Sequence, residues 1–187
     1  MQVKQPPNRG LSMREAAYHE AAHAVIAIEL GVEVIRATLK IKSGVIDGWV
    51  RHARTPVKHR YVEVSPDCFD LRPARRSELH ASRKEAIIAY SGFHAECRLG
   101  VAEKRAALHA DGDAAQILQI SRGAFGSVNN RWLDKCWLRS FHLVAAQWEP
   151  IKAVAEALLE DRTLDGAHVK RIADRMRVKS RLAQVTA

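Results

Sequence analysis

The sequence predicts a mainly helical α+β domain with one small β-sheet. Two capping-box patterns, in which a serine precedes a glutamate by three residues, indicate the starts of long helices at Ser12 and Ser82. Between them, apolar and polar residues roughly alternate from Val34 to Ile41 and many are β-branched, which predicts a strand. With 187 residues, 47% of them hydrophobic, the chain can bury one sizeable core.

The first helix is expected from Met13 to about Leu30, because alanines favour it and Gly31 follows as a terminating residue. Its segment Ala21–Ile28 is apolar nearly all round, so we expect this helix to be packed on most sides. The same segment is too short to cross a bilayer, and we expect no membrane span.

The middle of the chain carries many turn signals. Ser43-Gly44 and Asp47-Gly48 are expected to divide short extended pieces after the first strand. Residues 51–82 contain prolines and scattered arginines, so an irregular exposed region is expected, with a short strand at Tyr61–Val64.

The second half reads as helical. The helix that starts after Ser82 should run over Ala86–Leu99 and stop at Gly100. Asp111 or Asp113 can cap the next helix, and Pro150 should separate or kink two later ones. Further helices are expected over Ala114–Ser121, Asn130–Gln147, Ile151–Leu159 and Gly166–Met176.

Composition favours one domain over residues 11–178, between a flexible tail at 1–10 and a basic tail at 179–187. The first ten residues lack the apolar centre of a secretory signal, and the three cysteines form no paired motif, so a cytoplasmic protein without disulfides is expected. The net charge of +9 favours acidic partners. The basic residues after Gly166 carry no interleaved aromatics, so nucleic acid is not the favoured partner.

A metal-binding pattern lies inside the first helix. His19 and His23 are four residues apart and therefore project from one helix face, where both imidazoles can reach one cation. Glu20 can hydrogen-bond a water at the open position of a zinc ion and act as general base. Two histidines and a carboxylate in a largely apolar helix would be costly without such partners.

A catalytic zinc takes three protein ligands, so a third donor must come from elsewhere. The residues alone leave this choice open. The candidates are Glu96, His94, His109, Asp111 and Asp113.

The segment Tyr18–Val25 resembles the zinc helix of the FtsH-type peptidases, the proteolytic partners of membrane-bound AAA ATPases. Ile88–Gly100 is similar to the second helix of that family, with its Ala-Glu pair. The family's ligand turn resembles His109–Ala114, and its carboxy-terminal segment resembles Leu158–Asp165. One departure is Ala22, where the family usually has glycine. The resemblance covers about Leu11–Met176.

This resemblance implies a zincin-like helical peptidase domain in which His19, His23 and Asp113 hold zinc and Glu20 is the catalytic base. Asp111 remains a neighbouring alternative, and Glu96 could orient a ligand or pair with an arginine. The chain contains no Gly-x-x-x-x-Gly-Lys loop, so ATP hydrolysis is not expected.

The sequence therefore predicts a stand-alone zinc metalloendopeptidase that cleaves peptides or unfolded protein segments. A separate ATPase partner and a homo-oligomer are open by analogy with the family. One alternative is a non-catalytic, metal-containing module that binds nucleic acid or a partner protein through its basic surface. Another is a structural zinc protein without turnover.

Overall fold

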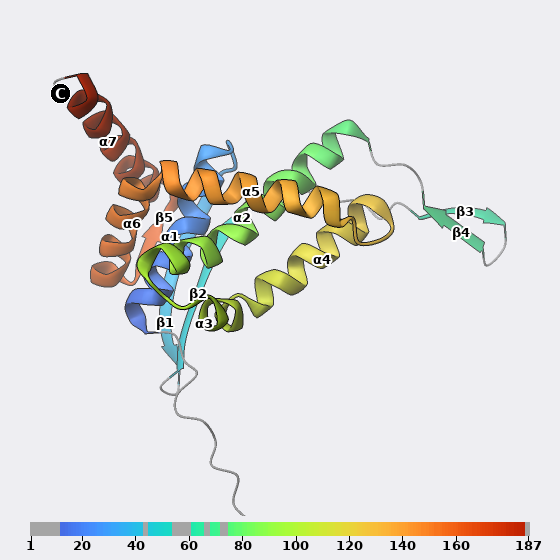
Figure 1. The fold of residues 1–187 in the computed structure, drawn as a ribbon, viewed down its shortest axis with the longest axis horizontal. Coiled ribbons are helices and arrows are strands. Elements are labelled where there is room, and N and C mark those ends of the chain that lie inside the picture. The colour runs from blue at the N-terminus through green and yellow to red at the C-terminus, as the bar shows by residue number, and fades with distance from the viewer. Residues whose placement is uncertain (1–11, 43–44, 54–60, 66–67, 72–74, 186–187) are drawn as a thin grey trace, which may run out of the picture.

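Helix α1 (Met13–Glu29) runs through the centre of the molecule and contacts α2, α6 and the strands β1 and β2. Every residue from Ala16 to Ala27 is buried. The capping box is present as predicted: Ser12 Oγ accepts from the Glu15 amide, and the Glu15 carboxylate accepts from the Ser12 amide. Figure 1 shows the other helices arranged around α1.

The computed structural model describes residues 12–42, 45–53, 61–65, 68–71 and 75–185. The predicted tail at 1–10 and the turn at Ser43-Gly44 lie outside them. The helices after α1 are α2 (Arg76–Leu99), α3 (Glu103–His109), α4 (Asp111–Phe125), α5 (Asn130–Ala146), α6 (Trp148–Asp161) and α7 (Gly166–Val185). The mainly helical α+β class is therefore confirmed.

The main sheet has three antiparallel strands in the order β2-β1-β5, formed by β1 (Val34–Lys42), β2 (Val45–His52) and β5 (Thr163–Asp165). A separate hairpin pairs β3 (Tyr61–Ser65) with β4 (Cys68–Leu71), and Figure 1 draws it away from the helices. The strand expected at Tyr61–Val64 is thus confirmed.

Two boundaries differ from the prediction for tertiary reasons. Asp47-Gly48 does not interrupt the sheet: Asp47 pairs with Lys40 and Gly48 with Leu39, so β2 continues through them. Helix α2 begins at Arg76, six residues before Ser82, because the Glu78 carboxylate accepts from the Arg75 amide and caps the helix earlier.

The later helices also correct the sequence reading. Neither Asp111 nor Asp113 is an N-cap, since both lie inside the first turn of α4. Helix α6 begins at Trp148, so Pro150 sits in a first turn, where its missing amide hydrogen costs nothing. The last helix continues to Val185 instead of ending at Met176.

Glycines end three elements as left-handed residues, among them Gly31 and Gly100, as predicted. Among the described residues, none of the helices has the length and apolar character needed to cross a membrane.

Candidate metal centre

The two histidines of α1 and one aspartate of α4 converge at one point. The Nε2 atoms of His19 and His23 lie 3.0 Å and 3.3 Å from Oδ2 of Asp113. One ligand atom from each of the three residues falls within 4.8 Å of the others, so this cluster could hold a metal ion. The i, i+4 spacing places the imidazoles on one face, and their rings meet edge to face at 4.6 Å.

A buried carboxylate fixes the orientation of His19. Glu96, fully buried on α2, accepts from Nδ1 of His19 through Oε1 at 2.6 Å. Its second oxygen, Oε2, accepts from Nδ1 of His109 at 2.6 Å. Because Nδ1 of His19 bonds to Glu96, Nε2 is the nitrogen that faces Asp113 and the one that could bind a metal ion after losing its proton.

The orientation of His23 is fixed by the backbone of α2. Its Nδ1 donates to the carbonyl oxygen of Ile88 at 2.8 Å, and the Ser91 hydroxyl lies 3.3 Å from the same nitrogen. Ser91 donates its own proton to that carbonyl at 2.6 Å. Both histidines therefore present Nε2 to the same point, which is the arrangement that metal-binding imidazoles take.

Charges at this point are strongly coupled. Burial by itself would lower the pKa of His19, but hydrogen bonds to Asp113 and Glu96 outweigh it and raise the pKa to about 10. The pKa of His23 is also raised, since Asp113 outweighs its burial. The imidazoles in turn hold the pKa of Asp113 well below its usual range, against the effect of burial. The raised pKa of both imidazoles beside Asp113 indicates that the cluster stabilises positive charge.

The donor set fits a tetrahedral divalent ion. Ligands about 2.0 to 2.1 Å from zinc at tetrahedral angles would lie about 3.3 Å from each other. The two histidine–aspartate distances, 3.0 Å and 3.3 Å, are close to that spacing. Two imidazole nitrogens and one carboxylate oxygen also leave a fourth position without a protein ligand.

A cavity of about 360 Å³ opens over this cluster, and Glu20 is part of its wall. Strand β2 forms one side with Ile46, Asp47, Gly48, Trp49 and Val50, and α2 adds Ile88 and Ala89. Burial raises the pKa of Glu20, although the two imidazoles lower it. Glu20 therefore follows His19 in the chain and also lines the cavity beside the cluster.

Two glycines let backbone approach the site closely. A Cβ atom on Gly48 would lie 2.6 Å from Cγ of Glu20, and one on Gly92 would lie 2.4 Å from Nε2 of His19. Both contacts are closer than real Cβ atoms come, so a larger residue at either position would displace Glu20 or His19.

The structure sorts the five candidates for the third ligand. Asp113 joins the cluster, whereas Asp111 is exposed and Glu96 supports His19 from behind. His109 shares Glu96 with His19 and lines the cavity. His94 is buried on another side of α2, with its ring 4.2 Å from that of Trp137.

Sequence reasoning missed several residues that shape the site. The bond from His109 to Glu96, the carbonyl of Ile88 and the contact of Gly48 with Glu20 had no local signal. Gly92 offered one, because it lies four residues before Glu96 and therefore on the same helix face.

The chain was also compared with known proteins. It matches no family model, and no curated protein matches it. The chemistry of this site is therefore inferred from its own geometry.

Proposed function

We propose that the protein is a zinc-dependent metalloendopeptidase of zincin-like architecture that hydrolyses peptide bonds in peptides or unfolded protein segments. The observation that carries this proposal is the convergence of His19, His23 and Asp113 beside Glu20 in one cavity. The resemblance of Tyr18–Val25 to the zinc helix of the FtsH-type peptidases supports it as well.

The donor set supports zinc. Two imidazoles, which would lose their Nε2 protons on binding, and one carboxylate suit this ion in a site with an open position. The bonds that His19 and His23 donate from Nδ1 to Glu96 and to the Ile88 carbonyl leave each Nε2 to act as the ligand. When bound, zinc would polarise the scissile carbonyl and lower the pKa of water to about 7.

Glu20 has the position of a general base. Its carboxylate is buried against Gly48 of β2 and lines the cavity beside the cluster. In the proposed reaction it takes a proton from the attacking water and returns that proton to the leaving amine nitrogen. Its raised pKa, caused by burial, brings its basicity nearer to that needed around neutral pH.

The edge of the sheet supports a peptide substrate. β2 is the outer strand of the order β2-β1-β5, and its segment Ile46–Val50 forms one wall of the cavity. An extended peptide can pair with such an edge through main-chain hydrogen bonds. Apolar side chains of Ile46, Trp49 and Val50 would then contact the substrate beside the scissile bond.

The test compares Glu20→Gln with the unchanged protein, using a metal assay and cleavage of casein. We expect stoichiometric zinc in both and a loss of cleavage of roughly 10²- to 10⁴-fold in the variant, because a general base contributes about that much. Glu103→Gln, an exposed change on α3, is the matched control and should cleave normally.

Zinc binding without cleavage of casein by the unchanged protein would contradict the proposal. That result would favour the metal-containing binding module instead. Salt-sensitive binding of nucleic acid that persists in the double variant His19→Ala, His23→Ala would identify such a module.

A further inference from the structure

His109 is a buried histidine to which the proposed reaction gives no role. It is the last residue of α3, and its side chain is 4% exposed. Its Nδ1 donates to Oε2 of Glu96 at 2.6 Å, and the residue lines the metal-centre cavity. Among the described residues, His109 does not belong to the group of ligand atoms that could hold the ion, so it does not act as a direct ligand.

The carboxylate of Glu96 depends on two imidazoles. Glu96 is fully buried, and in the described structure its Oε1 accepts from His19 and its Oε2 from His109, each at 2.6 Å. A buried carboxylate is costly unless its oxygens are hydrogen-bonded. Without His109, Oε2 would lose its partner, and the carboxylate would turn toward water or another donor. Because the two oxygens belong to one rigid group, Oε1 would then move away from Nδ1 of His19.

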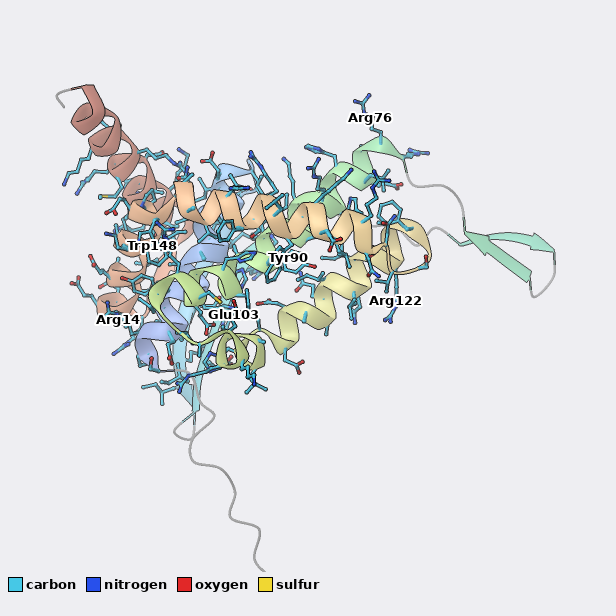
Figure 2. All side chains as sticks on the ribbon, in the orientation of Figure 1. Arg14, Arg76, Tyr90, Glu103, Arg122 and Trp148 are labelled. Atoms are coloured by element: carbon cyan, nitrogen blue, oxygen red, sulfur yellow. The ribbon has the colours of Figure 1, made fainter. Side chains whose placement is uncertain are left out.

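The packing of α3 holds His109 in place. Ala106 lies one turn before His109, on the same side of the helix, and is fully buried. The helix contacts α2 and α4, and Arg105 links it to the start of α1 through an ion pair with Glu15 at 2.8 Å. Figure 2 labels Glu103, the first residue of α3. His109 therefore lies on the packed side of a helix that is fixed to its neighbours.

The same segment leads into the third ligand. α3 ends at His109 and α4 begins at Asp111, so Asp113 lies in the first turn of the next helix. The bond from His109 to Glu96 therefore attaches the chain to α2 four residues before Asp113. His109 is placed to hold Glu96 directly and the start of α4 through the chain.

We propose that His109 is a positioning residue of the metal centre. Its bond to Oε2 holds Glu96 so that Oε1 stays on Nδ1 of His19, which in turn keeps Nε2 of His19 directed at the ion. This inference rests on the zinc site proposed above. Loss of the His109 imidazole should weaken zinc binding although no ligand is removed.

The test measures zinc affinity by chelator competition in His109→Phe, His109→Ala and His109→Asn. Groups behind a ligand usually contribute about 10- to 100-fold in metal affinity, and we expect His109→Phe and His109→Ala to bind zinc roughly tenfold more weakly. His109→Asn should bind zinc like the unchanged protein, because the amide nitrogen of asparagine branches from Cγ as Nδ1 of histidine does and can donate to a carboxylate. Rescue by asparagine separates the hydrogen bond from a loss of packing.

The matched control is His94→Phe, which makes the same change at another buried histidine. His94 lines a second cavity, of about 210 Å³ between α2 and α5, that shares no lining residue with the metal-centre cavity. The zinc affinity of His94→Phe should equal that of the unchanged protein. Urea unfolding without metal shows whether each variant is folded, and His109→Ala carries the test if the larger side chain of His109→Phe prevents folding.

A second readout reports the geometry of the centre without an activity assay. Cobalt(II) in place of zinc has visible absorption bands that depend on the number and arrangement of its ligands. His109→Phe should change these bands, and His109→Asn should leave them as in the unchanged protein.

Unchanged affinity and an unchanged cobalt spectrum in His109→Phe would overturn this inference and leave the zinc site in place. So would a loss of affinity that His109→Asn or His94→Phe shares, or failure of both His109→Phe and His109→Ala to fold. An unchanged protein that binds neither zinc nor cobalt would overturn the proposed function together with this inference.

Discussion

The candidate metal centre and the cavity between α2 and α5 each contain a buried histidine, His19 and His94, but the two imidazoles have opposite properties. His19 has partners at both nitrogens, Glu96 and Asp113, which raise its pKa to about 10 despite its burial. His94 is buried among aromatic rings with Nε2 unpaired, and burial lowers its pKa to about 4. Burial therefore does not by itself decide the charge of a histidine. The neighbouring carboxylates decide it.

The comparison also separates two kinds of site. In the candidate metal centre both imidazoles are oriented by a further group, Glu96 for His19 and the carbonyl of Ile88 for His23, so the cluster is arranged to receive a cation. At the cavity between α2 and α5, Nε2 of His94 has no hydrogen-bond partner in the described structure, and Trp137, Leu138 and Phe141 of the adjoining helix are exposed. Four predictions test this difference.

The largest effect is expected from Asp113→Ala. Loss of a direct ligand should reduce zinc affinity by more than the 10- to 100-fold that a change behind a ligand costs. The rise in melting temperature on adding zinc should disappear with it. Asp111→Ala, two residues away and exposed in the same helical turn, should bind zinc like the unchanged protein. Equal affinities in the two variants, measured by chelator competition, would remove Asp113 from the ligand set.

Glu96→Gln should lower zinc affinity by roughly 10- to 100-fold. A glutamine has one acceptor oxygen, whereas Glu96 accepts from both His19 and His109, so one imidazole must lose its partner. The same chelator competition measures the change, with Glu103→Gln as the exposed control. Unchanged affinity would show that the buried carboxylate does not orient His19.

Gly48→Ala should destabilise the fold by about 1 to 3 kcal/mol, as overpacking usually does, and should reduce cleavage because Glu20 must move. Gly112→Ala is matched, since Gly112 lines the same cavity but its added Cβ would meet no atom within 4 Å. Urea unfolding and casein cleavage measure both effects. If the two alanine variants behave alike, β2 does not approach Glu20 as closely as described.

The smallest effect is expected from His94→Phe, which should stabilise the protein by about 1 kcal/mol at neutral pH by removing an unpaired buried nitrogen. The dependence of stability on pH should also change at acid pH. Because the pKa of His94 falls from 6.5 to about 4 on folding, the unchanged protein loses stability as pH drops from about 6.5 to 4. The variant should lose less over this interval in urea unfolding. Identical pH profiles would show that His94 has a partner in solution.

Helix α1 shows how much the sequence could predict. Its cap at Ser12, its end before Gly31 and the shared face of His19 and His23 follow from interactions within a few residues. The strand from Val34 was likewise predicted from local alternation, and the helix expected over Asn130–Gln147 is present and ends at Ala146. The start of α2 was not predicted correctly, because the capping pattern at Ser82 lies inside the helix.

What the sequence by itself determined is the pair of imidazoles with Glu20 between them, since helical geometry fixes residues four apart. The tertiary structure decided the rest of the centre. Asp113 lies 94 residues from His19 in the chain, and Glu96 lies 77 away. Which of several acidic residues reaches the imidazoles depends on how α2, α4 and β2 pack against α1, and packing between distant segments leaves no periodic signal in the sequence.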